Sequence, residues 1–138
     1  MKYEFTSEEK KIGQGVVFHR VIAMRDFGDV KAGDIGGWVE DYQNLSQGDD
    51  CSWVYDDACV CGKAYVSGNA RISGNARVFG NAYVSGNAQI SENAWVFDHA
   101  RVFGNACITG STNVCGYTRI SDDARFDCAR VSRPTPAE

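Results

Sequence analysis

The sequence has no long apolar run and no secretory signal pattern along its 138 residues. A membrane-spanning helix needs roughly 18 or more consecutive apolar residues, so no transmembrane segment is predicted. We therefore expect a soluble protein of the cytoplasm. In that reducing compartment cysteines are predicted to remain free thiols rather than to form a disulfide framework. The six cysteines lie at positions 51, 59, 61, 107, 115 and 128.

The sequence also lacks a large excess of charge of either sign, since its formal net charge is −4. Residues 1–53 carry ten acidic and six basic side chains, whereas residues 54–126 carry six of each. A DNA mimic needs dense acidic charge and a duplex-binding protein needs a basic stripe, so the neutral segment argues against both classes. The acidic excess of the N-terminal segment would instead favour encounter with a basic protein partner.

Motifs for catalysis and for metal binding are missing as well. The sequence contains no recognisable phosphate-binding loop, Ser-His-Asp set or pair of catalytic carboxylates. Cys59 and Cys61 would project two thiols from one face, but no second Cys or His pair stands at ligand spacing, so neither metal nor cofactor is predicted. His19 falls in a predicted strand without a partner nearby in sequence. His99 replaces Asn at a predicted corner and is a weak candidate base.

What the sequence does contain is a six-residue repeat from Val54 to Phe126. Thirteen positions six residues apart hold Val, Ile or, once, Phe, and the clearest unit reads Val/Ile-x-Gly-Asn-Ala-x. So short a unit cannot bury its own apolar side chain and must stack on its neighbours, as in a β-solenoid. A period of six indicates a short strand with an inward Val or Ile, followed by a Gly-Asn corner. We expect the corner to select Asn because Asn tolerates positive φ.

Three corners per coil would give a triangular cross-section with an 18-residue period. In that arrangement Asn69, Asn87 and Asn105 lie one coil apart and predict an amide ladder. The register extends back to Val39 and Leu45, with three residues inserted before Val54, and it breaks after Phe126. The sequence thus predicts three parts: an N-terminal β cap at residues 1–38, a solenoid at 39–131 and a C-terminal tail at 132–138.

The first 38 residues do not follow the repeat. Residues 2–5 and 16–24 are typical of strands and predict a hairpin, with residues 7–14 as the polar turn between them. Residues 26–38 contain four glycines and are predicted to form irregular turns that lead into the first coil. Because the end of a solenoid exposes an unpaired strand edge, we expect this segment to cap it.

The outward residues of the three walls are not equivalent. Residues 18 apart would lie about 4.8 Å apart on adjacent coils, which gathers Phe79, Trp95 and Phe97 into one exposed aromatic cluster beside Arg77. The same rule turns Trp53 outward on another wall. An apolar patch with Trp, Phe and Arg is typical of an interface, so these four residues form the predicted self-association surface of a dimer or trimer. The alternative is a ligand pocket between subunits, with Arg77 at an anion and Trp95 stacked on a base.

The Gly-Asn-Ala-x-Val hexads between residues 66 and 107 resemble those of the hexapeptide-repeat superfamily. The resemblance implies an all-β fold, a single-stranded left-handed parallel β-helix with three hexads per coil. The stretch at 19–38, followed by Asn44-Leu45-Ser46 and the hexads, further resembles uncharacterised YdcK-like hexapeptide-repeat proteins that are common in phages and prophages.

The best-known members of the superfamily are trimeric acyltransferases that use a His at a cleft between subunits. Only His99 matches that role by residue type, and both the surrounding motif and the long closing loop are missing. We therefore expect a non-enzymatic, self-associating module that binds another protein, with no membrane or duplex nucleic acid as partner. The phage resemblance implies inhibition of a host defence protein in the host cytoplasm. An acyltransferase-like enzyme and a nucleotide-sequestering oligomer are the alternatives.

Overall fold

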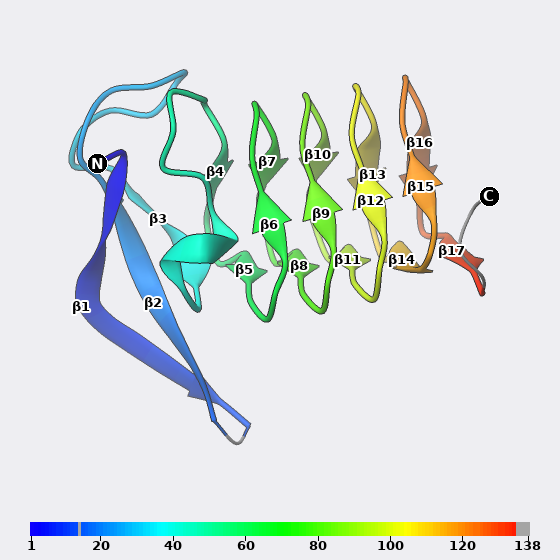
Figure 1. Cartoon of the computed structure of the whole chain (residues 1–138), viewed down its shortest axis with the longest axis horizontal. Coiled ribbons are helices and arrows are strands. Elements are labelled where there is room, and N and C mark those ends of the chain that lie inside the picture. Colours follow the sequence, from blue (N-terminus) through cyan, green and yellow to red (C-terminus); the bar gives the residue numbers. More distant parts are fainter. Residues whose placement is uncertain (14, 135–138) are drawn as a thin grey trace.

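The computed structural model describes residues 1–13 and 15–134, which form a β-solenoid with a β-hairpin at its N-terminal end (Figure 1). Within these residues no helix is long and apolar enough to cross a membrane. The solenoid strands are β4 (Trp53–Val54), β5 (Cys59–Val60), β6 (Tyr65–Val66), β7 (Arg71–Ile72), β8 (Arg77–Val78), β9 (Tyr83–Val84), β10 (Gln89–Ile90), β11 (Trp95–Val96), β12 (Arg101–Val102), β13 (Cys107–Thr109), β14 (Asn113–Gly116), β15 (Arg119–Ile120), β16 (Arg125–Asp127) and β17 (Arg130–Arg133).

The three walls of the solenoid are parallel sheets in which each strand pairs with the strand one coil away. The five-stranded wall has the order β16-β13-β10-β7-β4, and the four-stranded wall has the order β15-β12-β9-β6. On the eight-stranded wall, Trp95 pairs with Arg77 on one side and with Asn113 on the other, which is the predicted 18-residue register. The coils wind in the left-handed sense that the hexapeptide repeat implies (Figure 1). The predicted fold class is thus confirmed.

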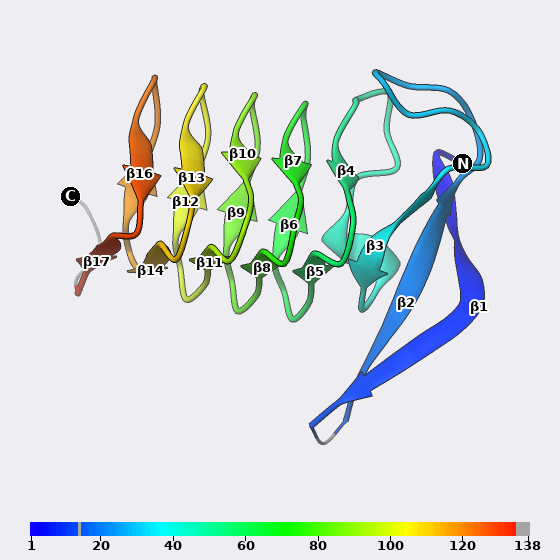
Figure 2. The same cartoon turned by 180° about the vertical axis from the view of Figure 1, so that it is seen from behind.

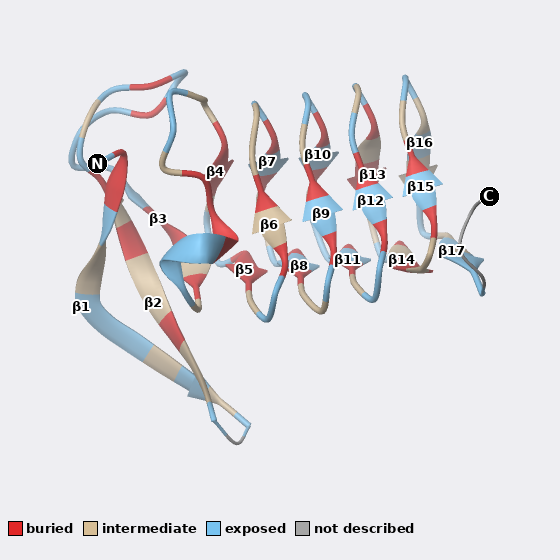
Figure 3. Ribbon diagram, viewed as in Figure 1, coloured by how far each residue is buried: buried red, intermediate tan, exposed pale blue. Residues whose placement is uncertain are grey.

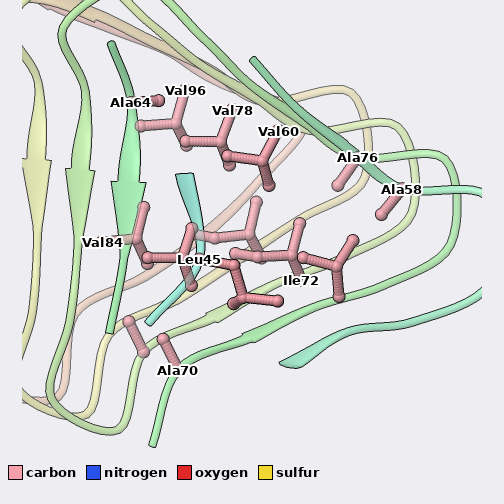
Figure 4. Close-up of a cluster of buried hydrophobic side chains, with 14 of the residues drawn as sticks. Leu45, Ala58, Val60, Ala64, Ala70, Ile72, Ala76, Val78, Val84 and Val96 are labelled. Atoms are coloured by element: carbon pink, nitrogen blue, oxygen red, sulfur yellow. The ribbon is translucent and has the colours of Figure 1, made fainter. Parts of the chain in front are cut away.

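The interior is a column of Val and Ile side chains edged by Ala (Figure 4). Val60, Val78 and Val96 stack one above another, and each is fully buried. Burial of one such side chain contributes about 1.5–3 kcal/mol, and the contribution recurs at every hexad. Figure 3 shows that many solenoid strands, such as β9 and β12, combine an exposed outward residue with a buried inward one.

The corners differ from the prediction in which residue adopts positive φ. That conformation belongs to the third hexad position, as at Gly68 (φ 66°) and Asp98 (φ 60°), and not to the Asn that follows it. The Asn side chains instead form hydrogen bonds between coils. The amide of Asn69 donates to Asn87 and that of Asn87 donates to Asn105, both at 3.2 Å. The predicted amide ladder is therefore present.

Carboxylates replace Gly at several corners and have a structural role there. Asp98 Oδ2 accepts a hydrogen bond from the backbone N–H of Gly116, one coil further on, at 2.9 Å. Asp56 and Glu92 accept in the same way from Gly74 and Gly110. Each of these bonds offsets part of the cost of positive φ at a residue with a Cβ.

The N-terminal hairpin is longer than predicted. Strand β1 (Tyr3–Ile12) pairs antiparallel with β2 (Val16–Ala23), with an irregularity between Phe5 and Glu9. The predicted polar turn at 7–14 is wrong, because residues 7–12 belong to β1; Gln14 lies outside the described residues. As an edge strand, β1 has much of its surface in solvent. Its residues are therefore mostly polar, and the sequence does not show the apolar pattern by which a strand is usually predicted.

Strand β3 (Ile35–Val39) replaces the predicted irregular turns at the end of residues 26–38. It pairs antiparallel with β2 and parallel with β5, so the hairpin and the solenoid share the eight-stranded sheet β1-β2-β3-β5-β8-β11-β14-β17. Gly36 and Gly37 permit close approach: a Cβ on Gly36 would lie 2.6 Å from the Trp53 ring, and one on Gly37 would lie 2.6 Å from the Ala58 carbonyl oxygen. These glycines therefore serve packing and not turns.

Trp53, predicted to point outward into solvent, is buried at 1% exposure. Its ring meets Phe27 and Tyr3 edge-on, with centroid distances of 5.2 and 6.1 Å. Beside it the Lys2 ammonium group is fully buried and lies 2.8 Å from Asp50 Oδ1, while also donating to the Ser52 carbonyl oxygen. The N-terminus is thus anchored to the first coil by a few buried groups.

Both ends of the solenoid follow the predicted register with local adjustments. Val39 pairs with Val60 and Leu45 bridges to Val66, each 21 residues apart, which agrees with a three-residue insertion. At the other end Val131 pairs with Val114, 17 residues away. Strand β17 continues to Arg133, beyond the predicted end of the solenoid at 131. Residues 135–138 of the predicted tail lie outside the described residues. A 3-10 turn, η1 (Tyr42–Asn44), precedes Leu45.

Candidate functional site

The aromatic cluster consists of Phe79, Trp95 and Phe97, which the structure gathers with Arg77 on the outer face of the eight-stranded wall. Phe79 and Phe97 lie one coil apart and stack at 4.8 Å between ring centroids, with an interplanar angle of 1°. Trp95 meets the edge of Phe79 at 5.8 Å, and the Arg77 guanidinium lies 5.5 Å from the Trp95 ring centroid. The predicted grouping of these four side chains is present, while their use as an interface stays a prediction.

Trp95 is the most exposed member of the cluster. It is 40% exposed, and Phe79 and Phe97 are half-buried. Aromatic contacts of this kind contribute about 0.5–1.5 kcal/mol beyond area burial, so the cluster is held in place before any partner arrives. Its exposed surface remains apolar.

The hairpin adds a second surface to the site. It leaves the edge of the wall, and its tip hangs below β5 in both Figure 1 and Figure 2. Val16 and Phe18 alternate along β2 and so share one face, on which Ile12 lies opposite Val16. Between this face and the wall is a cavity of about 170 Å³, lined by Ile12, Val16, Phe18, Cys59, Cys61, Arg77, Phe79 and Trp95.

The hairpin side of this cavity was not predicted from the sequence. The alternation of apolar residues along β2 indicated a buried strand face but not which surface would cover it. Only the course of the folded sheet brings Val16 and Phe18 opposite Phe79 and Trp95.

The two thiols in the cavity are poor nucleophiles. Burial raises the pKa of the Cys59 thiol, and burial together with the nearby Glu40 carboxylate raises the pKa of Cys61 to about 11. Both thiols are therefore protonated at neutral pH. Among the described residues no group of three or more His, Cys, Asp and Glu is placed to hold a metal ion. All six cysteines are free.

A shallower, polar hollow lies beside the cavity and has a volume of about 430 Å³. Arg77 and Trp95 line both spaces, so they lie at the border between the apolar cavity and a hollow whose other lining residues are Asn and Ser. No ion pair involves Arg77 among the residues that the structure describes, whereas Arg71 on the five-stranded wall lies 3.3 Å from Asp29. The other residues of the polar hollow are Asn75, Asn93, Ser111 and Asn113.

Neither histidine is among the lining residues of the two hollows. His99 is at an exposed corner, where its ring stacks on Tyr117 at 4.7 Å and 4°. The adjacent Asp98 carboxylate is engaged by the Gly116 N–H. His19 stacks on Phe5 at 4.4 Å, with Nδ1 3.6 Å from Glu9 Oε2. The structure therefore brings His99 and the aromatic cluster to different places, and a catalytic role for His99 stays a prediction.

Comparisons with known proteins match the repeat region. A family model described as "YdcK Beta solenoid repeat" matches residues 70–86. A protein of Escherichia coli (strain K12) named "Uncharacterized acetyltransferase YdcK" is 36% identical over 56 residues. That alignment covers 41% of this chain and 17% of the relative. The similarity thus extends over a small part of the longer protein. Like the left-handed coil and the 18-residue register, these matches support the predicted resemblance to hexapeptide-repeat, YdcK-like proteins.

Proposed function

We propose that this chain is a non-enzymatic interaction module that self-associates through the outer face of the eight-stranded wall. The observation that carries the proposal is the contiguous, partly exposed patch of Phe79, Trp95 and Phe97 beside Arg77. Large aromatic side chains and Arg are the residue types most enriched among interface hot spots.

The charges of the wall support a second copy as the occupant. Of the eight positions that flank the inward Val of β5, β8, β11 and β14, Arg77 is the one charged residue, and depletion of charge is typical of interface cores. The whole segment 54–126 is neutral, with six acidic and six basic residues, so two copies do not repel each other strongly. A two-fold arrangement would bury the patch against itself, as isologous dimers do.

The experiment is a measurement of molar mass against concentration by light scattering or sedimentation. The Phe97→Asp variant places a charge in the centre of the patch, and the proposal predicts a monomer at concentrations where the unaltered chain is oligomeric. Phe103→Asp is the matched control, because Phe103 follows the inward Val102 as Phe97 follows Val96 but lies on the four-stranded wall. The proposal fails if the unaltered chain is monomeric throughout, or if both variants dissociate alike. Circular dichroism verifies that each variant is folded.

Capture of a second protein is the finer part of the proposal. If the chain is phage-encoded and inhibits a host defence protein, that protein should be retained by the immobilised chain and lost with Trp95→Asp. Loss of capture with an N-terminal charge reversal, and not with Trp95→Asp, would assign recognition to the acidic segment 1–53 instead.

Two other functions each have one supporting observation. The name of the Escherichia coli relative favours acyl transfer, which predicts binding of an acyl donor and loss of activity in His99→Ala. The position of Arg77 over Trp95 favours nucleotide sequestration, which predicts release of an ultraviolet-absorbing nucleotide when purified protein is heated. Self-association without either result supports the interaction module.

A further inference from the structure

The cavity between the hairpin and the eight-stranded wall has the size and lining of a small-ligand site. Seven of its eight lining residues have apolar or thiol side chains. Its volume of about 170 Å³ is close to that of an engineered apolar cavity, roughly 150 Å³, that stays dry and takes up benzene. The space therefore suits one aromatic ring or a short alkyl group.

Arg77 gives this site a charge preference. It is the one charged residue in the lining, its guanidinium leans on the Trp95 ring, and it has no ion pair among the described residues. A guanidinium presents paired N–H donors that match a carboxylate. Arg77 also lines the polar hollow. If a ligand places its ring in the cavity, an anionic group attached to that ring would therefore lie beside Arg77, at the border of the hollow.

The amides of the polar hollow are available to the same anionic group. On the corner of Asn69, Asn87 and Asn105 the side-chain amides bond to one another. Asn75 and Asn93 are also one coil apart, yet neither has a side-chain hydrogen bond among the described residues. Their N–H donors can therefore turn to a ligand.

The cysteines make the site non-covalent. Burial is the main cause that raises the pKa of both Cys59 and Cys61, so the thiols are neutral near pH 7 and add soft apolar surface. A thiolate would be needed for attack on a ligand.

From this geometry we propose that the cavity binds a small carboxylate that carries an aromatic ring. Its ring lies among Val16, Phe18 and Phe79, and its carboxylate meets Arg77 at the border of the polar hollow. This binding site goes beyond the proposed self-association. It shares Arg77, Phe79 and Trp95 with that surface, whereas Phe97 is not part of the cavity lining.

The experiment is a calorimetric or NMR titration of the whole chain with 3-phenylpropionate. The proposal predicts saturable binding, with shifted signals at Ile12, Val16 and Phe18. Toluene, which has the ring without the charge, should bind at least about tenfold more weakly, and 3-phenylpropylamine should not bind, since its cation faces Arg77. Acetate, which has the charge without the ring, should not bind either.

Two variants separate the ring from the charge. Arg77→Gln should weaken 3-phenylpropionate about tenfold or more and leave toluene unchanged, whereas Val16→Trp fills the cavity and should abolish binding of both. Arg101→Gln is the matched control, because Arg101 holds the equivalent strand position on the four-stranded wall. Thermal melting verifies that the variants are folded.

Repeating the titration over a range of protein concentrations, with the molar mass measured at each, separates ligand binding from the oligomeric state. The proposal is overturned if 3-phenylpropionate does not bind at millimolar concentrations. It is also overturned if the amine binds as well as the acid, or if Arg77→Gln and Arg101→Gln behave alike.

Discussion

The repeating coils and the N-terminal segment of this chain are stabilised in different ways. Each coil adds the same small set of interactions: three inward aliphatic side chains, three corners and a register of backbone hydrogen bonds. The N-terminal segment depends on a few large buried groups, among them Lys2 and Tyr3, the latter packed against Trp53 of β4. Loss of one buried polar group of the N-terminal segment should therefore cost much, because its partner is left unsatisfied, whereas a substitution at an exposed corner of the coils should cost little.

The largest effect is expected at Lys2. The Lys2→Met substitution removes the cation that neutralises Asp50 and leaves a partly buried carboxylate without its partner. We expect the free energy of unfolding to fall by about 3 kcal/mol, measured by chemical denaturation. Lys63→Met, at an exposed corner of the coils, should change it by less than about 0.5 kcal/mol. Similar losses at the two lysines would contradict the contrast between segment and coils.

An intermediate effect is expected at the acidic corners. Asp98→Ala keeps a Cβ at φ 60° and loses the hydrogen bond to Gly116, so it should destabilise by about 1–2 kcal/mol. Asp98→Gly loses the same bond but removes the strain of positive φ, so its stability should stay near that of the unaltered chain. The two variants differ by one methyl group, and equal losses in chemical denaturation would refute this role of the carboxylate.

Alkaline pH should weaken the contact between the N-terminal segment and the five-stranded wall. Burial, with the hydrogen bond that Tyr55 donates to Asp29, raises the pKa of Tyr55 to about 12. Between pH 10 and about 12 the folded chain keeps this proton while the unfolded chain loses it. The Tyr55 contribution to stability is therefore complete below pH 10 and lost as pH rises toward 12.

The measurement is the slope of unfolding free energy against pH between 9 and 11.5, with a shallower slope expected for Tyr55→Phe. Tyr3, whose pKa burial also raises, remains in that variant and keeps part of the slope. An unchanged slope in Tyr55→Phe would show that its phenol is not held protonated by the fold.

The smallest effect is expected in the amide ladder. Asn87 lies between Asn69 and Asn105, so Asn87→Ala removes two exposed hydrogen bonds and should cost about 0.5–1 kcal/mol. Asn93→Ala, at the same hexad position on another corner, removes none that the structure records and should be nearly neutral. A difference in melting temperature with the opposite sign would show that the ladder does not stabilise the corner.

The sequence predicted what the hexad period controls. Residues 18 apart must share a wall, so the grouping of Phe79, Trp95 and Phe97 and even the insertion before Val54 followed from counting. The ladder of Asn69, Asn87 and Asn105 was predicted from the same spacing, although that spacing does not join Asn75 to Asn93. Local periodicity specifies these features because each coil contacts only its neighbours.

The features that the sequence did not predict depend on contacts between segments that are not related by the six-residue repeat. The strand at Ser7 to Ile12 exists because β2 supplies its partner, not because its own residues alternate. Gly36 and Gly37 resemble turn residues until the Trp53 ring is placed against them. The cavity, likewise, requires the hairpin to bend over the wall, and no local pattern in residues 1–38 encodes that course.

The most direct test of self-association through the eight-stranded wall is sedimentation equilibrium of the unaltered chain beside Phe97→Asp and Phe103→Asp. The expected result is a mass at a multiple of 15.1 kDa for the unaltered chain and for Phe103→Asp, and 15.1 kDa for folded Phe97→Asp. A mass of 15.1 kDa for the unaltered chain at every concentration would contradict the proposal.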